Sequence, residues 1–187
     1  MMRLLGRVAL VTAATTPAGS AIVTQFSGAG ASVIALESDP TCPLAVAEGV
    51  SRALAEFGRL DMLVSCDPTV EAALVGGRSS LPPLRARGGS IINVARPPDA
   101  GDDEFEMHAA AAQHGGIVAL TRSMALTYAP HGIRCNAICL PGTARHGWPA
   151  SAASFNDLAR TALHLSSPQA GFVTGAIVGA DADWRAA

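Results

Sequence analysis

The stretch GRVALVTAATTPAGSAIVTQFSGAGASVIALE, residues 6–37, decides the fold. It opens with a short apolar run at 8–13 that is rich in branched side chains, which is typical of a buried strand. The Thr-Pro pair at 16–17 predicts a helix start, because threonine caps free N–H groups and proline suits the first helical position. An apolar-periodic helix follows over 18–26, and a second apolar run at 32–36 predicts another strand. A strand, a helix and a strand within about thirty residues place two parallel strands side by side.

The same alternation continues through the rest of the chain. We expect further helices over 44–57, 103–128 and 155–165, and strands at 60–65, 90–95, 133–139 and 176–180. These strands are almost wholly apolar, as in a sheet that helices cover on both faces. The sequence therefore predicts an α/β fold, a doubly wound Rossmann-like parallel sheet of about six strands, in a single domain over residues 1–187. The longest loop-like stretch is 76–89, which holds Pro82 and Pro83.

Composition and charge exclude several classes of protein. The 187 residues are 49% hydrophobic and 15% charged, which is enough for a core without disulfides or a structural metal. The chain has 37 alanines and no lysine, so any mechanism that needs a lysine is excluded. A net charge of −2 with only scattered arginines argues against nucleic acid or a membrane surface as partner, and favours a small-molecule substrate. The four cysteines show no C-x-x-C spacing, so we expect reduced thiols and a cytoplasmic location.

Several segments together resemble the short-chain dehydrogenase/reductase family, whose members are NAD(P)-dependent Rossmann-type oxidoreductases. The opening stretch resembles the family's first strand, glycine turn and helix. GRLDMLVSCD (58–67) and GGSIINVA (88–95) resemble two later strands. GGIVALTRSMALTYAPHGIRCNAICLPG (115–142) resembles the family's long helix, sixth strand and Pro-Gly turn. The segments follow one another in the family's order over most of the chain, so the resemblance implies the family's fold.

The chain is shorter than the family in two places. Between Glu37 and Asp61 there is room for one helix, but not for the helix, strand and second helix of the family. We therefore expect the strand beyond the second one to be missing. Between Asp67 and Gly89, the resemblance implies that the family's long interface helix is largely absent.

The cofactor turn departs from the family pattern Thr-Gly-x-x-x-Gly-x-Gly, because only its last glycine survives in the stretch 12–19. Glycines there permit a tight turn and let the backbone approach a pyrophosphate at the helix N-terminus. Ala13 adds a methyl group and Pro17 removes an N–H. The acid after the second strand stands where the family would hold a ribose diol and prefer NAD over NADP. If a nucleotide binds, the resemblance assigns it to the remnants of the family's site, Thr12, Gly19, Glu37, Pro141 and Gly142.

The family's catalytic residues are absent as well. Catalysis there uses asparagine, serine, tyrosine and lysine, with the tyrosine giving or taking the proton. Here Arg96 falls at the serine position, Ala110 at the tyrosine position and His114 at the lysine position. The only tyrosine, Tyr128, lies about five helical turns beyond Ala110 and cannot substitute. We therefore expect that the usual hydride transfer is abandoned and that no cofactor is needed.

A polar set nevertheless remains at the predicted carboxyl ends of the strands, and it supplies the candidate catalytic residues His114, Arg96, Asp67 and His146. His114 or Asp67 would act as general acid or base, and Arg96 would stabilise developing negative charge. His146 takes the place of a family threonine near the nicotinamide amide. The set predicts a cofactor-independent enzyme that cyclises, eliminates, isomerises or decarboxylates a small carbonyl compound. The composition, rich in Ala, Gly and Arg, is typical of a high-GC bacterium and suggests secondary metabolism.

Two alternatives remain open. The first is an NAD(H)-dependent oxidoreductase with a non-standard proton donor, such as His114 or a water, because Gly19 and Glu37 are kept. The second is a non-catalytic pseudoenzyme or partner subunit, because the catalytic residues are lost. We expect no metal, since His108 and His114 lie six residues apart instead of the i, i+4 spacing of joint ligands. The family's closing helix and strand build a dimer interface, and the segment at 172–184 keeps that apolar character, so the resemblance implies a homodimer.

Overall fold

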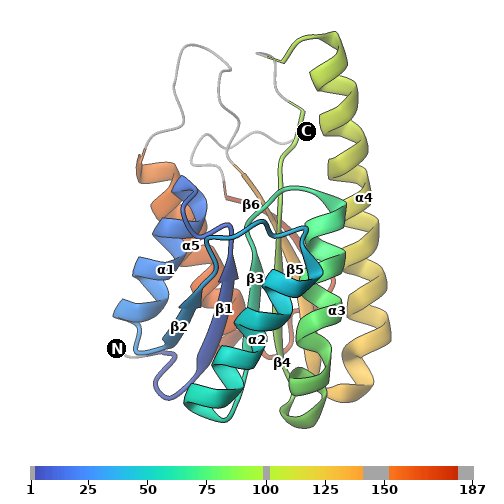
Figure 1. Ribbon diagram of the computed structural model, residues 1–187. Helices are drawn as coiled ribbons and strands as arrows, with labels where there is room; N and C mark the ends of the chain where they lie inside the picture. The colour runs from blue at the N-terminus through green and yellow to red at the C-terminus, as the bar shows by residue number, and fades with distance from the viewer. Residues whose placement is uncertain (1–2, 99–101, 141–151, 181–187) are drawn as a thin grey trace.

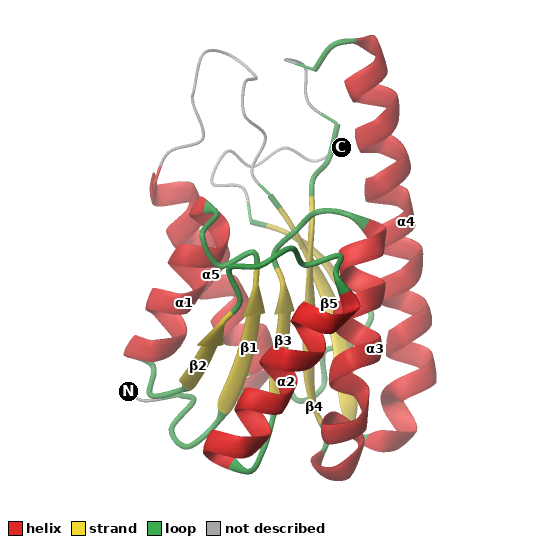
Figure 2. Ribbon diagram, in the orientation of Figure 1, coloured by secondary structure: helices red, strands yellow, loops and turns green. Residues whose placement is uncertain are grey.

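The protein folds as one parallel sheet between two layers of helices (Figures 1 and 2). A computed structural model describes residues 3–98, 102–140 and 152–180, apart from the side chains of 152–154. The strands are β1 (Val8–Thr12), β2 (Ser32–Ala35), β3 (Met62–Ser65), β4 (Gly89–Ala95), β5 (Ile133–Cys139) and β6 (Ile177–Gly179). The helices are α1 (Pro17–Gly28), α2 (Pro43–Phe57), α3 (Val70–Arg87), α4 (Glu104–Tyr128) and α5 (Ala152–Ser166), with 3-10 turns at Ala129–His131 and Pro168–Ala170.

The strand order is β2-β1-β3-β4-β5-β6, and every pair is parallel. This confirms the predicted doubly wound, six-stranded sheet. A single helix, α2, connects β2 to β3, so β2 forms one edge of the sheet and the expected loss of the strand beyond it is also confirmed. α1 and α5 cover one face, and α2, α3 and α4 cover the other (Figure 1).

Alternation along the central strands separates the two halves of the core. Val11 and Val64 pack on the α1 and α5 side, whereas their neighbours Leu10 and Leu63 pack on the α2 side. All four side chains are fully buried. Successive residues of a strand point to opposite faces, so a sheet that is covered on both sides needs apolar residues at most positions of its strands. The continuous apolar runs of the sequence arise from this requirement.

The start of α1 follows the sequence prediction. The Thr16 hydroxyl accepts a hydrogen bond from the Gly19 N–H at 3.1 Å, and Pro17 takes the first helical position. Proline does not destabilise the helix there, because an N–H group at the first helical position would have no intrahelical acceptor. The helix ends at Gly28.

Most of the stretch expected to be a loop, residues 76–87, is instead part of α3, an 18-residue helix. Our prediction that the family's helix between Asp67 and Gly89 is largely absent is therefore wrong. Pro82 and Pro83 lie inside the helix, where they remove backbone donors. Pro82 is exposed, so water can reach the backbone near it, while Leu84 is fully buried and anchors the last turn against the core.

A buried carboxylate ties together the starts of β1 and β3. The side chain of Asp61 is 2% exposed and accepts hydrogen bonds from Arg59 at 2.8 and 2.5 Å, from Arg7 at 3.1 Å and from the Val8 N–H at 2.9 Å. Burial by itself would raise the pKa of Asp61, but the hydrogen bonds from Arg59, Val8 and Arg7 outweigh it and lower the pKa below its ordinary value. The charged form of Asp61 therefore stabilises this end of the sheet.

α4 extends well beyond the carboxyl edge of the sheet (Figure 1). It begins with a capping box in which Asp103 and Glu106 each accept from the other's backbone N–H. Every residue from 103 to 109 is exposed, and Ala110 is the first buried residue of the helix. Within the described ranges, no helix combines the length and the apolar character that crossing a membrane requires.

Candidate functional site

The turn between β1 and α1 is tight although it lacks the early glycines. Ala13 has φ +48°, a left-handed conformation that glycine adopts more readily. The Thr16 N–H and hydroxyl both donate to the Ala13 carbonyl oxygen, at 3.1 and 2.8 Å. A Cβ at Gly19 would lie 2.3 Å from that same oxygen, so only glycine fits there. The helix N-terminus is thus held close against the end of β1.

Two backbone donors at this turn remain available. Pro17 has no N–H, and the Gly19 N–H is taken by the capping threonine. The N–H groups of Thr15 and Ala18 donate to no partner in the part of the chain that the structure describes. Free N–H groups at a helix N-terminus are a common site for phosphate oxygens. The turn therefore fits the pyrophosphate of a dinucleotide, with fewer donors than a glycine-rich turn offers.

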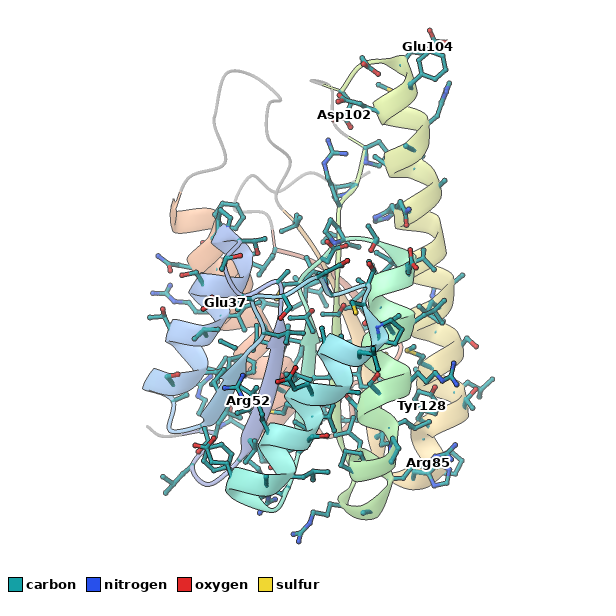
Figure 3. The ribbon with its side chains drawn as sticks, viewed as in Figure 1. Glu37, Arg52, Arg85, Asp102, Glu104 and Tyr128 are labelled. Carbon is teal, nitrogen blue, oxygen red and sulfur yellow. The ribbon has the colours of Figure 1, made fainter. Side chains whose placement is uncertain are left out.

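Glu37 lies beside the turn, whereas Thr12 does not face a ligand. The Ala14 N–H donates to the Leu36 carbonyl at 3.0 Å, which fixes the residue after it, Glu37, next to the turn. Glu37 is exposed, above the end of β2 (Figure 3). Thr12 is fully buried, and its hydroxyl accepts from the Cys66 N–H at 3.3 Å. The hydroxyl of Thr12 thus joins the ends of β1 and β3.

Arg96 follows β4 and forms an ion pair with Asp102, which the sequence did not lead us to expect. The Asp102 side chain is 6% exposed and the Arg96 side chain 36%. Figure 3 shows Asp102 near the start of α4, beyond the sheet edge. The pair connects the end of β4 to the segment before α4, and it offsets part of the charge that we expected Arg96 to direct at a substrate.

His114 lies at the level of the carboxyl ends of the strands. The neighbouring Gln113 accepts the first N–H of α3, that of Val70, at 2.9 Å. One turn further along α4, Ile117 is fully buried against Ala95 at the end of β4. Residues three apart share a helix face, so His114 lies on the side of α4 that is directed toward the strand ends. Its Nδ1 is buried and has no hydrogen-bond partner among the described residues.

Asp67 and Cys66 follow β3 at the same edge. Asp67 accepts from the Thr69 hydroxyl at 2.5 Å, and Thr69 in turn caps α3 by accepting from the Ala72 N–H at 3.3 Å. Asp67 thus holds the start of α3. Burial, and then the nearby charge of Asp67, raise the pKa of the Cys66 thiol to about 12, so Cys66 is not a nucleophile near neutral pH.

The structure places only some of the remaining candidates. His146, Pro141 and Gly142 lie outside the described residues. Tyr128 lies toward the end of α4 that is far from Asp102 (Figure 3), so it is remote from the strand ends. Over the described ranges, no group of three or more His, Cys, Asp or Glu side chains is arranged to hold a metal ion.

Comparison with known proteins identifies the family. Residues 69–155 match the family model described as enoyl-(acyl carrier protein) reductase. The chain is 30% identical to cis-4-hydroxycyclohexanecarboxylate dehydrogenase of Sinomonas cyclohexanicum, over 96% of this chain and 97% of that enzyme. A solved structure described as a short-chain dehydrogenase/reductase from Burkholderia xenovorans superposes with a TM-score of 0.78 at 24% identity, and the match covers 95% of each chain. The chain belongs to the short-chain dehydrogenase/reductase family.

Other relatives of this short-chain dehydrogenase/reductase are matched less completely. Peroxisomal 2,4-dienoyl-CoA reductase of Pongo abelii is 27% identical over 84% of this chain and 68% of the relative. 1,6-Dihydroxycyclohexa-2,4-diene-1-carboxylate dehydrogenase of Acinetobacter baylyi is 32% identical over 66% of this chain. The chain spans about two thirds of the first enzyme (68%) and about half of the second (55%).

The relatives correct two of our expectations. A cofactor-independent enzyme of the cyclising, eliminating, isomerising or decarboxylating kind is the wrong prediction, because the relatives are named as dehydrogenases and reductases. The expectation that no cofactor is needed is wrong for the same reason. Both errors came from treating the lost serine, tyrosine and lysine as the loss of the chemistry itself. The alternative prediction, an NAD(H)-dependent oxidoreductase, fits this short-chain dehydrogenase/reductase better.

Proposed function

We propose that the protein is an NAD(H)-dependent oxidoreductase that interconverts a small alcohol and its carbonyl compound, with His114 as proton donor and acceptor. The observation that carries the proposal is the buried, unpartnered Nδ1 of His114 on the side of α4 directed toward the strand ends. A buried polar atom without a partner costs about 1–3 kcal/mol. A ligand hydroxyl or a bridging water that completes this hydrogen bond would recover that cost.

The residues around the β1–α1 turn would hold the dinucleotide. Thr15 and Ala18 would donate their N–H groups to the pyrophosphate, and Gly19 keeps the turn close enough for this. Glu37 would accept hydrogen bonds from the ribose hydroxyls and repel a 2′-phosphate. A bound nicotinamide would supply the hydride acceptor in one direction and the hydride donor in the other. Pro141 and Gly142 stay predicted cofactor contacts.

The chain's own residues would then manage the proton and the substrate. In the oxidative direction, the imidazole of His114 would take the hydroxyl proton of the substrate while a bound nicotinamide would supply the hydride acceptor, so that the carbonyl product forms. Histidine suits this task because the imidazole can both accept and release a proton near neutral pH. Arg96, fixed by Asp102, would orient the substrate oxygen. Asp67 and His146 stay candidate catalytic residues.

The cofactor part of the proposal is tested by calorimetric titration with NADH and with NADPH. We expect NADH to bind at least about tenfold more tightly than NADPH, because a carboxylate beside a 2′-phosphate is repulsive. Glu37→Gln should reduce that preference, while Glu48→Gln, an exposed change on α2, should leave it intact. Absence of NADH binding at millimolar concentration would refute the proposal and leave the pseudoenzyme alternative.

The proton donor is tested by turnover of cyclic hydroxycarboxylates, the substrate type in the names of two relatives. His114→Gln should lower kcat about 100-fold, because a missing general acid or base costs factors of this size. Its affinity for NADH should change little. His108→Gln, on an exposed position of the same helix, serves as the matched control and should have no effect. Equal kcat in the wild type and in His114→Gln would exclude the assigned role.

Other expectations accompany this proposal. We propose a homodimer formed through the closing segment, where Phe172 is 87% exposed and an apolar contact would cover it. The four cysteines are free, in keeping with the reducing cytoplasm that we predict. A role in secondary metabolism and a single domain over residues 1–187 also stay predictions.

A further inference from the structure

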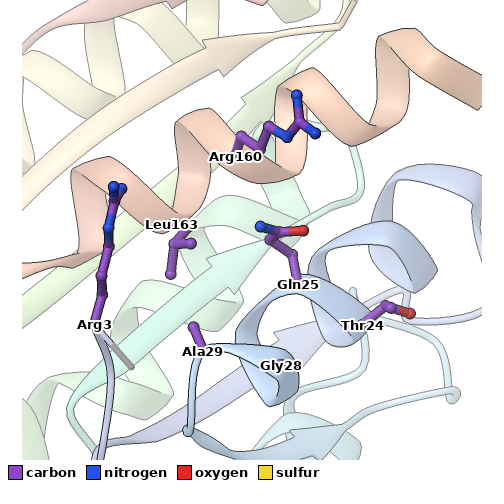
Figure 4. A pocket seen from close by; sticks show the side chains of 7 residues that line it. All are labelled: Arg3, Thr24, Gln25, Gly28, Ala29, Arg160 and Leu163. Atoms are coloured by element: carbon purple, nitrogen blue, oxygen red, sulfur yellow. The ribbon is translucent and has the colours of Figure 1, made fainter. Parts of the chain in front are cut away.

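A second site lies between the last turns of α1 and the middle of α5, near the first described residue. It is a pocket of about 480 Å³ lined by Arg3, Thr24, Gln25, Gly28, Ala29, Arg160 and Leu163 (Figure 4). α1 starts at the carboxyl end of β1 and runs back along the sheet, so its last turns lie at the opposite end of the molecule from the turn described above (Figure 1). The pocket is therefore separate from the proposed dinucleotide site.

The charged side chains of this pocket are both arginines. Arg3 comes from the N-terminal segment and Arg160 from α5, and Figure 4 shows them on opposite sides of Leu163. Arg3 forms no ion pair within the described ranges. Arg160 has one acidic partner, Asp157 at 3.4 Å, and both side chains of that pair are well exposed, at 70% and 44%. Exposed pairs of this kind are weak, so Arg160 can exchange Asp157 for a ligand.

The helix end beside the pocket does not oppose an anion strongly. The C-terminus of a helix carries partial negative charge on its free carbonyl groups. At the end of α1, however, the carbonyls of Gln25, Phe26 and Ser27 accept hydrogen bonds from the N–H groups of residues 29–31. The side-chain amide of Gln25 and the hydroxyl of Thr24 add neutral polar groups to the wall. The lining thus combines two cations with groups that can donate hydrogen bonds.

The base of the pocket is apolar. Ala29 is 6% exposed and Leu163 7%, and both belong to the core between α1, α5 and the sheet. A volume of this size lies within the range of small-molecule sites, and an apolar base with a few polar groups is their usual lining. We propose that the pocket binds a small organic dianion, a dicarboxylate or a phosphate monoester, with Arg3 and Arg160 contacting its negative charges.

The proposal is tested by isothermal calorimetry with succinate and with glycerol 3-phosphate, using butyrate and glycerol as monoanionic and neutral controls. We expect one dianion to bind at least about tenfold more tightly than the controls, since charge-assisted hydrogen bonds are the strong ones. Succinate ahead of glycerol 3-phosphate would assign a dicarboxylate, and the reverse order a phosphate monoester. No preference of either dianion over butyrate and glycerol would overturn the proposal.

Variants of the lining residues test whether the dianion binds in this pocket. Arg3→Gln and Arg160→Gln should each weaken the dianion about tenfold, whereas Arg52→Gln, an exposed change on α2, should not. Gly28→Leu tests the space itself, because a Cβ there meets no atom within 4 Å and the longer side chain would narrow the pocket. The affinity for NADH should be unchanged in all four variants, so the two proposed sites are judged separately. Dianion binding that survives Arg3→Gln, Arg160→Gln and Gly28→Leu would place it elsewhere and overturn the assignment.

Discussion

Replacing Asp61 with alanine is expected to lower the free energy of unfolding by about 3 kcal/mol, the usual size for removing one partner of a buried ion pair. The carboxylate is 2% exposed and accepts from Arg59, Arg7 and the Val8 N–H. Alanine would leave that N–H without its side-chain acceptor and would release two guanidinium groups. Denaturant unfolding followed by circular dichroism measures the difference.

The effect of Asp61→Ala should depend on pH. The pKa of Asp61 is lower in the folded protein than in the unfolded chain, where the pKa of an aspartate is about 4. Its stabilisation is therefore complete above about pH 4 and is lost as the pH falls through the folded-state pKa. Wild type and variant should converge in stability at acid pH. Arg7→Gln, whose side chain is 44% exposed in the wild type, is the matched control and should cost less than about 1 kcal/mol. A gap between wild type and Asp61→Ala that is independent of pH would contradict this account.

Gly19→Ala is expected to destabilise the protein by about 2 kcal/mol and to abolish measurable NADH binding. The new Cβ would lie 2.3 Å from the Ala13 oxygen and 2.8 Å from the Ala14 Cα. Both contacts are with backbone, so the turn itself has to move, and the N–H groups that would face the pyrophosphate move with it. Thermal unfolding and NADH calorimetry on the same variant measure the two effects.

Ala13→Gly, in the same turn, is the matched variant, and its effect on the stability of the protein should have the opposite sign. Ala13 has φ +48°, which costs an alanine about 1 kcal/mol relative to glycine. The variant should therefore be at least as stable as the wild type and should keep its affinity for NADH. If Gly19→Ala bound NADH as tightly as Ala13→Gly does, the turn would not be the dinucleotide site.

Most of the fold could be predicted because buried parallel strands appear in the sequence as short apolar runs. The strands are apolar at most positions, and the cap formed by Thr16 and Pro17 marks the start of α1. α3 could not be predicted in the same way. Pro82 and Pro83 suggest a loop when the sequence is taken alone, and only the packing of Leu84 and the rest of the buried face shows why the helix continues.

The site was harder to predict because its chemistry depends on contacts between distant residues. The sequence places His114 and Arg96 near the strand ends, but it does not show that the Nδ1 of His114 lacks a partner or that Arg96 forms an ion pair with Asp102. The absence of the family's motif residues predicts the loss of the redox chemistry, and the names of the relatives contradict that prediction. The pocket between α1 and α5 left no local signal either, because its arginines stand near opposite ends of the chain.

The projecting start of α4 should open locally while the rest of the protein stays folded. Residues 103–109 are all exposed, so their helical hydrogen bonds depend on the capping box and on local propensity alone. From Ala110 onward the helix is anchored, and Ile117 and Met124 are buried in the core. Amide exchange with solvent should consequently be fast in the first two turns through local fraying, and should slow toward the limit of global unfolding along the rest of the helix. His114 lies just past this boundary, in the part of α4 that is anchored to the core. The turns before it open and reclose while the rest of the protein stays folded.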